Sequence, residues 1–343
     1  MTIEKITLPI EYWNESETKV LCSQDVNGRV LECAYFSSVQ FTGYSKHYPM
    51  PLMYSHKDRK LRLPTIERFM SLGRGTVYEE TMKYDMELCS SWSGCHAPVF
   101  YFAYNMANYF HFIYDTLPYL YTYFEEKKTC PDLKLLVSPA EGKDDLYPFV
   151  WETLELLGIT RDDVVFLRQD VIYDYVLVGS SLTHGGLSEK PPHRFTFDII
   201  GRLRGTYEGP ERVYISRRTW MHNNLDNIGT NYTERRRCMN GIFSSAKYVS
   251  GPIGGGMANA LFCPSETKVL SINSPLFFDV NDRLKHAMEH TQLTHFDCTS
   301  FTDKKEEVVD SVGSLSISGG MNSPWEVDLN KLSKFLYTWI PQY

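Results

Sequence analysis

The chain has no apolar run that approaches the roughly 18 residues needed for a membrane-spanning helix. Residues 1–6 also lack the basic stretch and apolar stretch that make up a secretion signal. We therefore expect a cytoplasmic protein without a membrane span. Its 343 residues, 43% hydrophobic and 22% charged, are enough for two globular cores.

A regular cysteine pattern is also missing. None of the eight cysteines forms a C-x-x-C motif, and their spacing does not repeat: Cys22, Cys33, Cys89, Cys95, Cys130, Cys238, Cys263 and Cys298. In a chain of this length such cysteines are expected to be mostly reduced thiols.

Acidic residues outnumber basic ones overall, but positive charge is locally concentrated. The formal net charge of -7 argues against a general nucleic-acid-binding protein, which needs a basic face for the phosphate backbone. Arginines nevertheless gather in one stretch, at Arg202, Arg204, Arg212, Arg217, Arg218, Arg235, Arg236 and Arg237. An acidic protein with one basic stretch fits a small anionic ligand better than a polymer.

The chain also lacks Asp-x-Asp, the usual carboxylate pair that binds a metal and a diphosphate. His286, Glu289 and His290 match H-x-x-E-H, but no other metalloprotease signature accompanies them, and amphipathic helices often produce this spacing. We therefore expect no metal and no cofactor. Phosphate charge would be met by arginines and backbone N–H groups.

The apolar pattern predicts an α/β fold with two lobes. Residues 1–95 read as β-rich, with short mixed runs separated by turns. Strands then alternate with helices, and residues 184–192 read as a linker between an N-terminal region, 1–186, and a second region, 187–322. Such alternation implies parallel, doubly wound sheets in two Rossmann-like lobes that face a cleft. The expected strands are 99–102, 133–137, 164–167, 176–178, 213–216, 247–250 and 269–272. The expected helices are 108–123, 149–157, 197–203, 241–246, 257–262 and a C-terminal helix within 323–343.

A triple-glycine turn is the strongest local signal. Gly254, Gly255 and Gly256 stand between an expected strand and an expected helix, where backbone N–H groups and the helix dipole attract an anion. Arg217 and Arg218 follow another expected strand. Because neighbouring residues on a strand point to opposite faces, at most one of the two arginines is expected to touch a given phosphate. With the glycine turn nearby, we expect at least one of them to bind phosphate. The combination predicts a diphosphate site.

A second signal is the pair of His111 and Asp115. On a helix, residues four apart share one face, so the two side chains can form a hydrogen bond. An aspartate that holds an imidazole in one tautomer prepares a histidine general base. The alternative is an ordinary surface pair, but the neighbouring residues are apolar nearly all round the helix, which favours a buried pair beside a cleft.

Four segments, in order, resemble glycosyltransferase family 61. Residues 108–118 resemble its N-Y-x-H-x-x-x-D-x-L-P block, and residues 214–218 its Y-I-S-R-R strand. Residues 251–262 resemble its G-x-H-G-A-G-L-x-N-x-x-F turn, and residues 327–329 its V-D-L segment. In two respects the chain departs from the family. Ile253 replaces the usual His, and after Asn240 there is no room for the family's additional strand and helix, so that either this lobe is short or the chain lacks a segment.

The resemblance implies a GT-B, inverting transferase that uses a UDP-sugar such as UDP-xylose or UDP-N-acetylglucosamine, and the missing Asp-x-Asp predicts that it is metal-independent. Its acceptor would be a hydroxyl of a glycan or glycoprotein. Region 1–186 would bind the acceptor, region 187–322 the nucleotide sugar, and a helix in 323–343 would return to the N-terminal lobe. On these positions His111 and Asp115 are expected to be catalytic, Asn108 and Tyr109 to bind the acceptor, and the donor to meet Arg217, Arg218, Gly254, Gly255, Gly256 and Asn259.

Several alternatives remain open. Asp115 itself competes with His111 as the base. A nucleotide-dependent oxidoreductase would need G-x-G-x-x-G and a later acidic residue, and the sequence after Gly256 disfavours it. A non-catalytic carbohydrate-binding protein would also account for the many aromatic residues.

Overall fold

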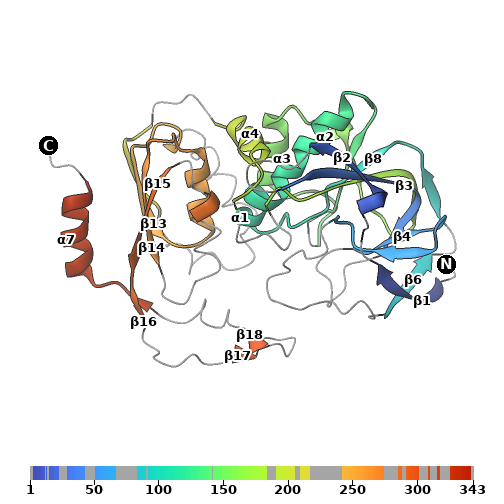
Figure 1. Cartoon of the computed structure of the whole chain (residues 1–343), viewed down its shortest axis with the longest axis horizontal. Coiled ribbons are helices and arrows are strands. Elements are labelled where there is room, and N and C mark those ends of the chain that lie inside the picture. The colour runs from blue at the N-terminus through green and yellow to red at the C-terminus, as the bar shows by residue number, and fades with distance from the viewer. Residues whose placement is uncertain are drawn as a thin grey trace. The chain divides into compact units, whose positions relative to one another are not determined.

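A computed structural model describes two compact units, Met1–Leu203 and Arg204–Tyr343 (Figure 1). The first unit contains a large mixed sheet and the second a parallel sheet, so the predicted α/β class is confirmed at that level. The sequence placed the boundary at 186/187, whereas the units divide after helix α4 (Phe195–Gly201). The described residues are 3–11, 13, 15–22, 29–42, 51–66, 83–89, 92–140, 142–183, 191–204, 209–216, 242–273, 285–287, 291–300, 308–309, 315–316 and 325–340.

In the described part of the first unit, eleven strands form one sheet in the order β10-β9-β8-β11-β3-β4-β5-β1-β6, with β2 beside β3 and β7 beside β11. The strands β8 to β11 are parallel to their neighbours in this order, and β11 pairs antiparallel with β3. The strands are β1 (Ile3–Glu11), β2 (Thr18–Cys22), β3 (Leu31–Phe41), β4 (Met53–Ser55), β5 (Lys60–Arg62), β6 (Lys83–Cys89), β7 (Ser93–Cys95), β8 (Val99–Tyr101), β9 (Lys134–Val137), β10 (Val164–Phe166) and β11 (Val171–Gly179).

The β-rich start of the chain therefore joins the same sheet as the alternating strands that follow it. Pairing with β3 satisfies the edge of β11, which would otherwise expose unpaired N–H and C=O groups. This is why the first unit has a mixed sheet and not the purely parallel one expected from the strand–helix alternation.

The helix expected over 108–123 is a continuous helical segment of four pieces. They are α1 (Tyr109–His111), the π-helix η2 (Phe112–Thr116), the 3-10 helix η3 (Leu117–Tyr119) and α2 (Leu120–Lys127). The change of winding coincides with Pro118, which has no N–H for a regular helical hydrogen bond. The N–H of Leu117 bonds instead to the carbonyl of Phe112, five residues back.

This segment packs into the core beside the parallel strands. The strand residues Phe100, Leu135 and Leu136 are fully buried, as are Phe112 and Leu120 on the helical segment. β8 and β9 consist almost entirely of buried apolar residues, which is typical of strands covered on both faces. The remaining helices of the unit are η1 (Glu15–Glu17), α3 (Pro148–Leu156), η4 (Arg161–Asp163) and α4.

The second unit contains a parallel sheet whose strand order follows the chain: β12 (Arg212–Tyr214), β13 (Tyr248–Pro252), β14 (Lys268–Asn273) and β15 (Gln292–Asp297). The 3-10 helix η7 (Gly255–Phe262) replaces the α-helix expected after the glycine turn. Figure 1 shows η7, in orange, and the red α7 (Leu329–Trp339) on opposite faces of this sheet. The described part of the unit also contains two short strand pairs: β16 (Thr299–Ser300) with β19 (Trp325–Glu326), and β17 (Val308–Val309) with β18 (Leu315–Ser316).

Helix α7 confirms the helical spacing of the C-terminal segment. Its N-cap residue is Asp328, whose carboxylate accepts hydrogen bonds from the N–H groups of Lys331 and Asn330, and these bonds lower the pKa of Asp328. Trp339 meets the ring of Tyr248 on β13, and Phe335 meets Phe296 on β15. These contacts lie within the second unit, and the return of the helix to the N-terminal lobe stays a prediction.

The cysteines whose side chains are described are free thiols: Cys22, Cys33, Cys95, Cys130, Cys263 and Cys298. Burial raises the pKa of Cys33 and of Cys263 to about 12. Since the thiolate is the reactive form, these two residues are protected twice, by their low accessibility and by their protonation.

We expect iodoacetamide at pH 8 to label the half-buried Cys22 and Cys130 before Cys33 and Cys263. Peptide mass spectrometry of the native protein at increasing times measures the order. In denaturant the four cysteines should label at similar rates. Labelling of Cys33 as fast as that of Cys130 in the native protein would contradict the buried position of β3.

Candidate functional site

The parallel strands of the first unit contain a point where the strand order reverses. Along β10-β9-β8-β11, the chain order runs backwards to β8 and then jumps to β11. In parallel α/β sheets, ligands bind outside the carboxyl ends of the strands at such a reversal. Here the carboxyl end of β8 is followed by residues 102–108, which lead into α1, and the carboxyl end of β11 is followed by residues 180–183. Both segments contribute to the site described next.

His111 and Asp115 form the hydrogen bond predicted from their spacing. His111 Nδ1 lies 2.7 Å from Asp115 Oδ2. The Asp115 side chain is 5% exposed, and that of His111 is 35% exposed. An ionised carboxylate can only accept, so Nδ1 carries the shared proton and Nε2 is the basic nitrogen of the neutral ring. The pair is therefore a buried carboxylate holding an imidazole that reaches the surface.

Asp115 lies within the π-helix η2, one turn after His111. Single π-turns inside helices occur frequently at functional sites, because they widen the helix and shift the direction of a side chain. The sequence predicted the pairing from regular helical geometry. The structure keeps the pairing with a wider turn.

Asn108 is the N-cap of the helix that carries His111. Its Oδ1 accepts hydrogen bonds from the N–H groups of Phe110 and His111, at 3.1 and 3.4 Å. Its own N–H donates to Oδ1 of Asn105, at 3.2 Å, and both asparagines are exposed. Because each amide oxygen faces the backbone, the amide NH₂ groups remain as donors at the start of the helix.

Tyr109, which the sequence also placed at the acceptor site, is buried at 5% exposure. Its ring packs edge-on against Phe149 of α3, with centroids 5.8 Å apart. This position makes Tyr109 part of the support beneath the helix. A contact between Tyr109 and an acceptor stays a prediction.

Sequence reasoning missed Thr183, which lies four residues after the end of β11. Its hydroxyl donates to Asp115 Oδ1 at 2.9 Å, so both carboxylate oxygens have a hydrogen-bond partner. Thr183 is 2% exposed. No local motif marks this threonine, and only the place of β11 beside β8 would have indicated it.

In the second unit, the glycine turn follows β13 as predicted. Gly254 has φ 144° and ψ -175°, a conformation that only glycine adopts readily. Gly255 and Gly256 are exposed, and a Cβ at Gly255 would have no neighbour within 4 Å. Asn259 Nδ2 donates to the carbonyl of Gly256 at 2.9 Å. Asn259 therefore braces the turn, and the donor contact expected of it stays a prediction.

The two predicted donor-site arginines, Arg217 and Arg218, lie outside the described residues. Asn240, Glu289 and His290, which the sequence also singled out, lie outside them as well. Ile215, which follows β12 and precedes the arginines, lies beside β13. Its N–H donates to the carbonyl of Ser250 at 2.7 Å. Gly251 is needed at this approach, because a Cβ there would lie 2.9 Å from the carbonyl oxygen of Ile215.

A row of polar side chains, which the sequence did not predict, lies near the carboxyl ends of β14 and β15. Ser271 Oγ donates to Asn273 Oδ1 at 2.6 Å, and Asn273 Nδ2 lies 2.6 Å from His295 Nδ1. Ser271 and Asn273 are buried. The row lies at the same end of the parallel strands as the glycine turn after β13, because Gly251 pairs with Ser271 and Ser271 pairs with His295.

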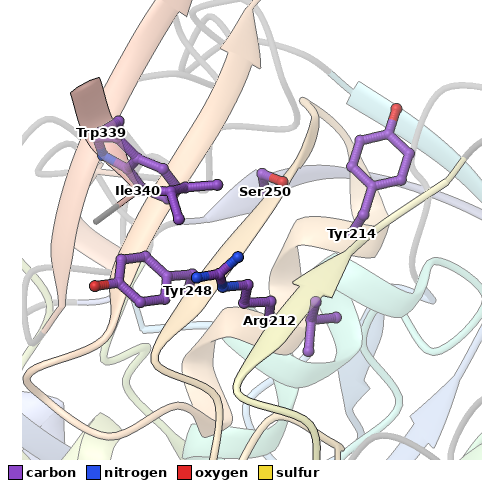
Figure 2. A pocket seen from close by; sticks show the side chains of 7 residues that line it. Arg212, Tyr214, Tyr248, Ser250, Trp339 and Ile340 are labelled. Carbon is purple, nitrogen blue, oxygen red and sulfur yellow. The ribbon is translucent and has the colours of Figure 1, made fainter. Parts of the chain in front are cut away.

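A pocket of about 200 Å³ lies on the face of this sheet that α7 covers (Figure 2). Arg212 lies 6.0 Å from the ring centroid of Tyr248, and Trp339 meets the same ring edge-on at 5.7 Å. The described lining residues are Arg212, Val213, Tyr214, Tyr248, Ser250, Trp339 and Ile340. Of the predicted site residues that the structure describes, none lines this pocket.

No protein-family model matches the chain, and no curated protein matches it. Among the described helices, none has both the length and the apolar character to span a bilayer. Within the same described residues, no three His, Cys, Asp or Glu side chains are grouped as metal ligands would be.

We expect Gly254→Ala to lower the free energy of unfolding by about 1–3 kcal/mol, because alanine is strained at this φ and ψ. Gly255→Ala is the matched control. Its Cβ enters open space, so its effect should stay within about 0.5 kcal/mol. Urea denaturation followed by tryptophan fluorescence measures both. Equal losses in the two variants would contradict the described turn.

Proposed function

We propose that this protein is an inverting glycosyltransferase of the GT-B type. It would transfer xylose or N-acetylglucosamine from a UDP-sugar to a hydroxyl of a glycan or glycoprotein acceptor. The observation that carries the proposal is the buried Asp115, hydrogen-bonded at both oxygens, which orients a surface-reaching imidazole where the strand order reverses. The ordered resemblance of four segments to glycosyltransferase family 61 supports the reaction class.

In this proposal His111 is the general base. The proton of the acceptor hydroxyl passes to Nε2 as the oxygen attacks the anomeric carbon in line with the leaving group. The new C–O bond forms, the bond from carbon to the phosphate oxygen breaks, and UDP leaves with the electron pair. Asp115 stabilises the imidazolium that forms, as the aspartate does in other His–Asp pairs.

The geometry favours His111 over Asp115 as the base. Both oxygens of Asp115 already accept hydrogen bonds, and the carboxylate is nearly enclosed. A base must come within hydrogen-bond reach of the hydroxyl that it deprotonates. The imidazole, one-third exposed, meets that condition better.

Acceptor and donor contacts follow from the residues around the two predicted sites. The amide of Asn108, and that of Asn105 beside it, would donate to acceptor hydroxyls next to His111. The donor diphosphate would lie at the N–H groups of Gly254, Gly255 and Gly256, with Arg217 and Arg218 supplying positive charge. The arrangement needs no metal, because these groups counter the charge on the leaving UDP.

His111→Ala and Asp115→Asn should each lower the transfer rate by about 10²–10⁴-fold, the usual worth of general-base catalysis. The dissociation constant of UDP, measured by isothermal titration calorimetry, should stay within about threefold of the wild-type value, because the proposed diphosphate site does not include these two side chains. Transfer is followed as UDP release from UDP-xylose and UDP-N-acetylglucosamine over a panel of glycan acceptors.

His96→Ala is the matched control. His96 Nδ1 also bonds to an aspartate, Asp174, at 2.5 Å, but its side chain is 85% exposed on the surface. This variant should keep wild-type transfer. Glycan binding by the wild type without UDP release from any donor would favour the carbohydrate-binding alternative, and full turnover by His111→Ala would refute the assignment of the base.

A further inference from the structure

The carboxylate of Asp115 is held from two directions by groups far apart in the sequence. His111 approaches Oδ2 from the preceding turn of the same helix. Thr183 approaches Oδ1 from the segment that follows β11. A carboxylate fixed at both oxygens cannot rotate about its own bond without breaking one of the two hydrogen bonds.

The place of Thr183 is set by the register of β3 and β11. Gly179 pairs with Cys33 in the antiparallel ladder, and continuing that register brings Thr183 opposite Arg29. Arg29 is 3% exposed, and its Nη2 donates to the carbonyl of Thr183 at 3.2 Å. Its Nε donates to the carbonyl of Pro191 at 2.8 Å.

The hydroxyl of Thr183 is aimed by its own turn as well. The N–H of Thr183 donates to Ser181 Oγ at 3.2 Å, a local bond that closes the backbone between the two residues. The N–H of His193 donates to the carbonyl of Leu182 at 2.8 Å, which ties the same loop to the chain before α4. The buried loop is thus fixed on both sides of the threonine.

We propose that Thr183 is a positioning residue for the general base. Its hydroxyl fixes the plane of the Asp115 carboxylate, and the carboxylate fixes His111 in the tautomer with the proton on Nδ1. Arg29 supports this arrangement by holding the backbone of Thr183. The catalytic role of Thr183 rests on the proposed function. Its effect on the tautomer of His111 does not, and spectroscopy of the imidazole can measure that effect without any transfer reaction.

The test compares Thr183→Val, which removes the hydroxyl at similar size, with Thr183→Ser, which keeps it. In ¹⁵N NMR spectra of the full chain at a pH where the ring is neutral, wild type and Thr183→Ser should show one dominant tautomer for His111, with Nδ1 protonated. Thr183→Val should show a mixture of both tautomers. His111→Ala assigns the signals.

Transfer kinetics give the second readout. Thr183→Val should lower kcat by about 10- to 100-fold, as expected for the loss of one hydrogen bond to a charged group, with KM for the donor unchanged. Thr183→Ser should restore most of kcat. In the Asp115→Asn background, Thr183→Val should cause little further loss, because the threonine acts through the aspartate.

Three results separate the outcomes. A folded Thr183→Val with the wild-type tautomer and wild-type kcat overturns the inference and leaves the proposed function standing. If the wild type shows the single tautomer but transfers no sugar, and Thr183→Val loses that tautomer, the positioning is supported and the glycosyltransferase is refuted. If Thr183→Val does not fold, as judged by thermal denaturation, Thr183→Ala removes the same hydroxyl without placing a methyl group against the carboxylate and decides the question by the same two readouts.

Discussion

The burial of one carboxylate determines how the candidate site is built. An ionised group removed from water must be met by hydrogen bonds or opposite charge, since an isolated buried charge is costly. Asp115 meets this requirement with His111 on its own helix and Thr183 after β11. The two partners lie on the segments that follow β8 and β11, the two strands between which the strand order reverses. Satisfying the charge therefore requires this part of the sheet to be assembled.

The β-rich start of the chain takes part in the same arrangement. β3 pairs with β11, and Arg29, just before β3, donates to the carbonyl of Thr183. A guanidinium this deeply buried is costly unless its donors are used, and here two backbone carbonyls accept from it. The first strands of the chain thus contribute to the position of a threonine that lies more than a hundred residues later.

Local sequence patterns predicted the parts of this structure that depend on local interactions. The apolar runs of β8 and β9 are strands, the helix over 108–123 is helical, and the spacing of His111 and Asp115 produced the expected hydrogen bond. The mixed sheet and the role of Thr183 depend on the pairing of β3 with β11, which no local pattern encodes. The π-helix around Asp115 was also missed, because a regular helix and one adjusted before Pro118 have the same apolar spacing. The sequence also could not show which position of the glycine turn requires glycine. Gly254 has a backbone conformation that other residues rarely adopt, whereas Gly255 does not.

The chemical character of the second partner decides which residue of the pair can act as a base. Had an arginine or lysine bonded to Asp115 Oδ1, its positive charge would have compensated the carboxylate, and little negative potential would have remained for the imidazole. A threonine hydroxyl is a neutral donor, so it fixes the geometry and leaves the charge. The carboxylate then holds the ring proton on Nδ1, so that Nε2 carries the lone pair of the neutral ring. With both oxygens engaged, Asp115 is poorly placed to take the acceptor's proton in the proposed mechanism. In the proposed mechanism, a neutral positioning group and a buried, charged orienting group together leave the partly exposed imidazole to accept the proton.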